Sequence, residues 1–329
     1  MRNAVIRATG AYLPKRVLPN SYFNESLGVN VSDWLEQTLD IHERRWCDAD
    51  ESTVDLCEHA ARQALDRAGL RPRDLDLIIV ATDTPEYLTP ATAAVLQDRI
   101  KAGHAGTFDL NAACAGFVTG VEVASKFIRT DPRYTHVLVI GAYAISKFLN
   151  PKDKKTVTLF ADGAGAILLE AQETEERGIL DSELITLGQY YDGMGIYGGG
   201  ARNPASYELI EHQAHTLRFN YRFPPELNPQ IWTHMARGML GRLGWRPLDV
   251  DHYLLTQINI NSIRKTLDNL DVPHARAHTA MQYYGYTGSA CIPIALNAAV
   301  EQGKIQPGER MLMIGSGSGL TFAGVALRY

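Results

Sequence analysis

The chain carries two copies of one pattern, and this internal repeat limits the available folds more than any other feature. Gly69–Val80 shares five identities in register with Gly244–Leu255, at an offset of 175 residues. A second pair, His136–Gly141 and Arg310–Gly315, follows at an offset of 174 residues. Self-similarity at a nearly constant spacing indicates a duplicated structural unit, so we predict two related halves.

Each copy alternates helical patterns with short buried strands. Leu77–Ala81 and Val137–Ile140 are apolar on both faces, which is typical of strands covered by helices on both sides. Between them, apolar residues from Phe117 to Ile128 recur with helical spacing. The matching segment from Ser289 to Val300 is small and apolar almost all round, which predicts a buried helix. These patterns predict a layered pseudo-twofold α/β structure in which the two central helices pack at the middle.

The boundary between the halves is placed at residue 170. Residues 1–170 then form the first half, and residues 171–329 form the second. A charged stretch, Glu173–Arg177, begins just after this boundary. Residues from about 190 to 223 contain five glycines and have no counterpart in the first half. They predict an inserted loop region that covers the surface or a cleft.

Composition excludes several classes of protein and site. The net charge of -5 gives no broad electrostatic attraction to nucleic acid. The four cysteines are scattered and lack the paired spacing of a zinc site or a disulfide framework. No apolar run reaches the 18 or so residues that a membrane span requires. We therefore expect a cytoplasmic protein with no membrane or nucleic-acid partner and no metal site.

Cys114 is the candidate nucleophile. Small residues precede it and the helical pattern follows directly, so its sulfur is expected near a helix N-terminus, where the helix dipole favours the thiolate. The alternative is a small buried apolar residue. Cys47, Cys57 and Cys291 show no such setting in the sequence. Near the C-terminus, the glycine-rich loop 315–319 follows an apolar run but lacks a Walker lysine, so an oxyanion hole fits it better than a nucleotide site.

Three motifs together carry a family resemblance. The segments Cys114–Phe117, Phe160–Ala166 and Gly317–Tyr329 resemble β-ketoacyl-acyl carrier protein (ACP) synthase III and its relatives in the thiolase superfamily. The resemblance implies a five-layered α-β-α-β-α thiolase fold, a homodimer, and ping-pong acyl transfer from acyl-CoA or acyl-ACP through a cysteine. It implies no permanently bound cofactor, because the coenzyme A thioester is a substrate.

The resemblance also assigns roles to residues of this chain. Cys114 would be the nucleophile, and the backbone N–H groups of Cys114 and Gly317 would form the oxyanion hole. Trp34 would stack on the adenine of coenzyme A, and Lys154 would be a basic partner of that molecule. An arginine usual near the tryptophan aligns with Thr38, which weakens the case for a phosphate contact there.

Two departures from the family pattern bear on the reaction. The family's histidine in Pro-His-Gln-x-Asn aligns with Thr256, and its asparagine in His-Gly-Asn-Thr aligns with Tyr286. Other residues of the two motifs are present, namely Gln257 and Asn259 in the first and Gly285 and Thr287 in the second. Each lost donor can add about 2 to 4 kcal/mol to the barrier. We expect decarboxylative condensation to be severely slowed and acylation of Cys114 to be less affected.

Three functions remain open on these grounds. The first is an acyltransferase that hands the acyl group of Cys114 to an acceptor with its own nucleophile. The second is a weakly active subunit that binds acyl chains or pairs with an active ketosynthase. The third is a conventional malonyl-using condensing enzyme with a rearranged site. We prefer the first, because an inactive partner has no physical need of Cys114.

Other polar residues are interpreted structurally. His274 and His278 have i,i+4 spacing but no evident carboxylate partner, so neither metal ligation nor a replacement base is expected. Arg44–Arg45 and Lys152–Lys155 are interpreted as solvated charges, with docking of an acidic carrier protein as the alternative.

Overall fold

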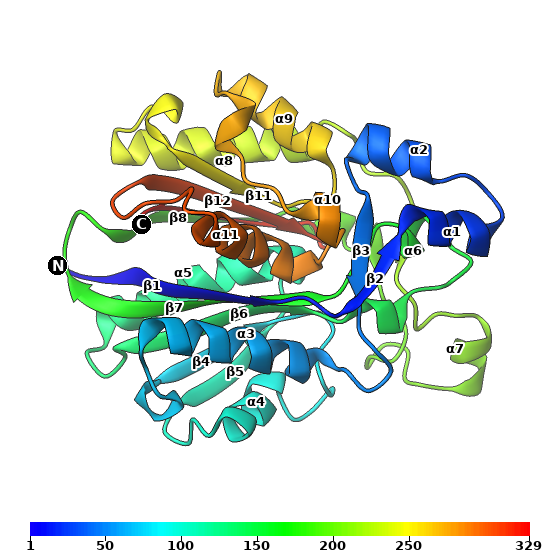
Figure 1. Ribbon diagram of the computed structural model, residues 1–329, viewed down its shortest axis with the longest axis horizontal. Coiled ribbons are helices and arrows are strands. Elements are labelled where there is room, and N and C mark those ends of the chain that lie inside the picture. The colour runs from blue at the N-terminus through cyan, green and yellow to red at the C-terminus, as the bar shows by residue number, and fades with distance from the viewer.

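Two mixed β-sheets built on one plan form the frame of the protein, and the computed structural model describes residues 1–329 (Figure 1). The first sheet has the strand order β1 (Arg2–Tyr12), β7 (Gly163–Glu173), β6 (His136–Tyr143), β4 (Leu77–Ala81) and β5 (Gly106–Leu110). The second has the order β8 (Gly178–Thr186), β13 (Thr321–Arg328), β12 (Arg310–Gly317) and β11 (His252–Leu255). The first sheet has two parallel pairs followed by two antiparallel pairs, and the second has one parallel pair followed by two antiparallel pairs. The shared order confirms the predicted duplication.

The repeated sequence segment is a helix end, a turn and a buried strand. Helix α3 (Thr53–Ala68) stops at Gly69 and helix α8 (Leu227–Leu243) stops at Gly244, both in the left-handed conformation that glycine adopts at low cost. The turns that follow are held by Arg71 bonded to Asp74 and by Arg246 bonded to Asp249. The identities seen in the sequence therefore mark local backbone requirements.

Helices and sheets alternate as α-β-α-β-α layers (Figure 1). Helices α3 and α4 (Thr92–Ile100) cover the outer face of the first sheet, and α8 and α9 (Ile260–Asn269) cover that of the second. Helix α5 (Gly116–Thr130) contacts strands of both sheets, and α11 (Cys291–Glu301) lies beside it in the middle layer. The expected thiolase-like arrangement, with two central helices, is confirmed.

The middle layer is closely packed around the start of each central helix. A Cβ atom at Gly141 of β6 would lie 2.3 Å from the carbonyl oxygen of Ser289, so only glycine lets this strand meet the turn before α11. Phe117 of α5 and Ile292 of α11 belong to the same cluster of 65 buried apolar residues. The cluster fixes where the two helices begin, and those two ends meet at the candidate site.

The two halves differ at their junction and in one long insertion. Strand β7 continues to Glu173, so the first sheet extends three residues beyond the boundary placed at 170. Residues 190–223 contain β9 (Met194–Gly195), which pairs with β10 (Arg218–Phe219), and the short helix α7 (Tyr207–Glu211). This segment lies over a cleft, because several of its side chains line cavities at the site.

The remaining elements lie at one end of the molecule (Figure 1). They are β2 (Arg16–Pro19), α1 (Asn20–Leu27), α2 (Ser32–Trp34), β3 (Glu43–Trp46), α6 (Lys154–Val157) and α10 (Met281–Tyr284). Each helix of the chain is either too short or too polar to span a lipid bilayer.

Candidate functional site

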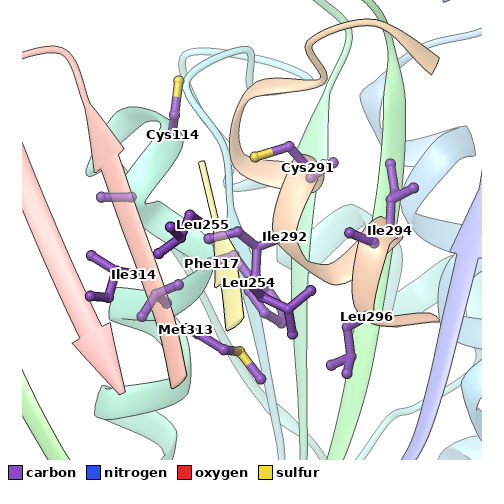
Figure 2. Packing of buried hydrophobic residues seen from close by; sticks show 14 of the residues in the cluster. Cys114, Phe117, Leu254, Leu255, Cys291, Ile292, Ile294, Leu296, Met313 and Ile314 are labelled. Carbon is purple, nitrogen blue, oxygen red and sulfur yellow. The ribbon is translucent and has the colours of Figure 1, made fainter. Parts of the chain in front are cut away.

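Cys114 lies where a short 3-10 turn, Ala113–Ala115, runs into helix α5. The preceding residue, Ala113, has a φ of 46°, a left-handed conformation that is costly for any residue with a Cβ atom. The Asn111 side chain accepts a hydrogen bond from the Ala113 N–H group at 3.0 Å and so supports this turn. Figure 2 shows the sulfur of Cys114 at the start of the helix, pointing away from the apolar packing around Phe117. The predicted position at a helix N-terminus is therefore observed.

Gly317 brings the end of strand β12 directly against Cys114. A Cβ atom at this glycine would lie 2.6 Å from the backbone nitrogen of Cys114 and 2.8 Å from the carbonyl oxygen of Ala112. Both neighbours are backbone atoms, which cannot move aside as a flexible side chain can. The two residues predicted to supply the oxyanion hole are thus adjacent in space.

The Thr256 side chain forms hydrogen bonds with the backbone at the end of strand β12. Its Oγ1 atom accepts a hydrogen bond from the Ser316 N–H group at 2.7 Å and donates to the Ser316 carbonyl at 3.4 Å. The side chain is buried, and it links the end of β11 to the end of β12 just before Gly317. Thr256 therefore positions the glycine-bearing strand end.

Removing this hydroxyl should destabilise the site measurably. We expect Thr256→Val to lower the free energy of unfolding by about 1–3 kcal/mol, because the buried Ser316 N–H group loses its acceptor while the side-chain shape is kept. Thr256→Ser, which keeps the hydroxyl, should recover most of that loss. Chemical denaturation of the two variants makes the comparison, and equal stability of both would contradict the assigned role.

Tyr286 belongs to the second half of the chain and lies near Cys114 of the first half. It follows Gly285, which has a φ of 64°, and its backbone is tied to the segment before β7 by hydrogen bonds with Leu159 and Ala161. The ring is buried and packs on Phe160 with centroids 5.3 Å apart. The Tyr286 hydroxyl acts to lower the pKa of the Cys114 thiol, against the larger effects of burial and of Asp83. The ring therefore lies close to the nucleophile.

The ionisation expected for Cys114 needs correction. Burial, and next the negative charge of Asp83, raise the pKa of the thiol well above its usual range, and the bond from Tyr286 opposes them only in part. The side chain is 2% exposed. The resting group is accordingly a neutral thiol, because desolvation outweighs the helix N-terminus. Sequence reasoning also missed Asp83, which comes two residues after strand β4.

Cys291 also differs from its sequence interpretation, which gave it no helix-terminal setting. It is the first residue of α11, and the repeat offset of 175 places it opposite Gly116, the first residue of α5. Burial raises its pKa to about 12, so it too is a neutral thiol. Figure 2 shows Cys114 and Cys291 at the starts of the two central helices.

An open cavity of about 320 Å³ extends to Gly317, which lies against the backbone of Cys114. Its inner wall holds Thr256, Tyr286 and Gly317, and its outer part is lined by Trp34. Side chains of the insertion complete the wall, among them Met194, Phe219 and Phe223. The insertion therefore shapes the entrance to the site.

Trp34 also borders a second cavity, of about 260 Å³, together with Lys154 and Lys155. The Trp34 side chain is 43% exposed, so its ring is available to a ligand. The two residues predicted to hold coenzyme A thus lie together, and their cavity adjoins the one that leads toward Cys114.

The structure corrects two further interpretations. Arg44 is fully buried and donates hydrogen bonds to the Leu18 and Thr158 carbonyls, so it is neither a solvated charge nor a docking residue. One of the two histidines at i,i+4 spacing has an acidic partner, and the other reaches a carboxylate only through a second histidine. His274 pairs with Asp268, and His278 contacts His252, which is bonded in turn to Glu309.

Known proteins resemble this chain in sequence and fold. The family described as 3-oxoacyl-[acyl-carrier-protein (ACP)] synthase III matches residues 108–188, and its C-terminal counterpart matches residues 240–329. A β-ketoacyl-[acyl-carrier-protein] synthase III of Sinorhizobium medicae is 37% identical over the full length of both chains. One of Caldanaerobacter subterraneus is 36% identical over 99% of this chain and 98% of its own.

Solved structures agree with these matches. The 3-oxoacyl-[acyl-carrier-protein] synthase III of Aquifex aeolicus superposes with a TM-score of 0.89 at 32% identity, covering 99% of this chain and all of that one. The enzyme of Pseudomonas aeruginosa superposes with a TM-score of 0.90 at 31% identity, covering 99% and 98%. Sequence, fold and the Cys114 site together place the chain in the β-ketoacyl-[acyl-carrier-protein] synthase III family.

Proposed function

We propose that this chain is an acyltransferase that takes an acyl group from acyl-CoA or acyl-ACP onto Cys114 and passes it to an acceptor. The observation that supports this most directly is the contact between Cys114 and the end of β12 at Gly317, beside the cavity that begins at Trp34. The pair of cavities that share Trp34 offers room for a thioester donor, with Lys154 as a cation for its phosphates.

The first half of the proposed reaction is the acylation of Cys114. The sulfur attacks the thioester carbonyl carbon, and the carbonyl oxygen becomes an oxyanion that accepts hydrogen bonds from the N–H groups of Cys114 and Gly317. Each such donor is worth on the order of 3 kcal/mol in the transition state. The bond between carbonyl carbon and donor sulfur then breaks, and the proton of the Cys114 thiol ends on the departing thiol.

The second half of the reaction frees Cys114. The nucleophile of the acceptor attacks the acyl-Cys114 thioester, and the cysteine leaves with the proton that the acceptor gives up. Ordinary decarboxylation of a malonyl acceptor is proposed to be slow, because the Thr256 hydroxyl is already hydrogen-bonded to Ser316, and Tyr286 places a phenol where the family has an asparagine. No histidine lines the cavity that would have to stabilise an enolate.

Intact-protein mass spectrometry with a panel of acyl-CoAs tests the proposal. The expected result is a mass increase equal to one acyl group. A wild-type protein that forms no adduct with any donor would instead favour a weakly active, acyl-binding subunit.

The second candidate is conventional condensation with a malonyl acceptor, because relatives that are 36% and 37% identical are named β-ketoacyl-[acyl-carrier-protein] synthase III. We expect little carbon dioxide release from malonyl-CoA or malonyl-ACP.

The Tyr286→Phe variant should acylate Cys114 more slowly than the wild type, by about tenfold or less, because it lacks the hydroxyl that acts to lower the pKa of the thiol. Tyr283→Phe, at an exposed ring, is the matched control.

One outcome would favour this second candidate. If carbon dioxide is released at an appreciable rate, and Tyr286→Phe or Thr256→Ala abolishes that release, then these side chains serve decarboxylation after all.

A further inference from the structure

A third cavity, of about 300 Å³, borders the segment just before Cys114. Its wall includes Ala112 and Ala113, just before the nucleophile, and Ser318 and Gly319, just after the glycine that abuts it. Met194 lines both this cavity and the entrance cavity. The third cavity therefore offers space for an acyl group beside the Cys114 segment.

Asp83 is the single charged residue that lines this third cavity. Its Oδ1 atom is enclosed and has no hydrogen-bond partner. No lysine, arginine or histidine is among the lining residues, and the other polar ones are Asn111, Tyr143, Tyr191, Tyr197, Ser318 and Thr321. Asp83 is partly exposed as a residue, so the unpaired Oδ1 atom is the one enclosed part of the group. An enclosed carboxylate oxygen without a hydrogen-bond donor is costly, and a ligand that donates to it would remove that cost.

The charge of Asp83 also bears on the reaction. Burial raises its pKa to about 6, so the carboxylate is mostly ionised at neutral pH. Its negative charge raises the pKa of the Cys114 thiol and of the Tyr143 phenol. A cation bound at Asp83 would cancel this effect and so make the nucleophile easier to ionise.

We propose that the third cavity holds the acyl group and that Asp83 selects acyl groups that carry an ammonium group. This inference rests on the proposed acyl transfer to Cys114. The cavity volume is at the lower end of the range for ligand pockets, which favours a short acyl chain. The Tyr143 and Tyr191 side chains in the wall are suitable neighbours for an ammonium group, because phenol rings attract cations.

A matched pair of donors tests the selection. β-Alanyl-CoA and butyryl-CoA differ only in an ammonium group that replaces a methyl group. Offered together in equal amounts, they should give β-alanyl adducts in about tenfold excess or more on the wild-type protein, as expected for a charge-assisted contact. Asp83→Asn should remove this preference while butyryl transfer stays equal or becomes faster. Asp50→Asn, at an exposed carboxylate, should behave like the wild type.

Several outcomes would overturn the inference. Equal or greater use of butyryl-CoA by the wild-type protein contradicts it. A loss of both transfers in Asp83→Asn, with the protein still folded, would make Asp83 a base for the thiol instead of a selectivity residue.

A binding measurement separates this inference from the proposed function. Calorimetry should show that propylammonium binds the wild-type protein, and that 1-propanol binds at least about tenfold more weakly because it lacks the charge. If neither acyl-CoA forms an adduct but propylammonium binds and Asp83→Asn abolishes the binding, the transferase proposal fails and the cation site stands. If propylammonium does not bind the wild-type protein, the cation site is wrong, whatever the acylation result.

Discussion

Replacing Cys114 by alanine should abolish the acyl adduct completely. Residues beside Cys114 line two cavities: Gly317 lines the entrance cavity, and Ala113 lines the third cavity. The end of β12 at Gly317 also lies against the backbone nitrogen of Cys114. Removing the sulfur leaves the surrounding backbone in place, because Cβ is retained and the turn is held by Asn111. The expected result is a folded protein whose mass does not change after incubation with acyl-CoA.

The control for this variant is Cys291→Ala. Cys291 is also buried at the start of a central helix, so it samples the same surroundings. Burial raises the pKa of its thiol to about 12, and its chain neighbours Ala290 and Ile292, unlike those of Cys114, line neither cavity. Cys291→Ala should therefore keep an adduct of full intensity. An adduct that survives in Cys114→Ala would place the acyl group elsewhere and end the proposed mechanism.

Much of the fold is encoded in short local patterns, which explains why it could be predicted. The glycines at 69 and 244 end two helices because a left-handed residue is needed there, and the Arg71–Asp74 bond needs only three residues of separation. Requirements of this kind appear in the sequence as identities at a fixed offset. The start of α5 just after Cys114 was predictable for the same reason, since small residues are followed directly by a helical apolar pattern.

Features that depend on contacts between distant segments were not predictable from those patterns. Arg44 is buried because the Thr158 carbonyl, 114 residues away, accepts one of its hydrogen bonds. The role of Thr256 depends on Ser316, 60 residues away. The neutral state of the Cys114 thiol depends on burial by both halves and on the charge of Asp83. In each case the residue type was evident, but its partner was not.

Asp83 and Cys291 each have a signal in the sequence that points to the site. Asp83 comes just after an apolar strand, and the carboxyl ends of such strands commonly face the ligand in α/β proteins. Cys291 lies at the repeat offset from the first residue of α5, so the duplication already implied a helix start. No sequence pattern could show that Asp83 lacks a cationic neighbour. That conclusion requires knowing every side chain around the residue.

The second large effect is expected for Gly317→Ala. The added methyl group would lie within 3 Å of the Cys114 nitrogen, the Ala112 oxygen and the Ala113 Cβ atom, so the strand end must move away from the nucleophile. Loss of one oxyanion donor costs about 10²- to 10³-fold in rate, and we expect acylation of Cys114 to slow by that factor. The time course of adduct formation, followed by mass spectrometry, measures it.

Two controls show whether that loss is local. Gly188→Ala adds a methyl group where no atom lies within 4 Å, so its acylation rate should match the wild type. Binding of free coenzyme A to Gly317→Ala should also stay near the wild-type value, because Trp34 and Lys154 line a second cavity to which Gly317 does not contribute. A Gly317→Ala protein that acylates within about threefold of the wild type would mean that this backbone supplies far less than the 10²- to 10³-fold typical of an oxyanion donor. The stabilising hydrogen bond would then have to come from another group, and the Tyr286 hydroxyl at the thiol would be the next to test.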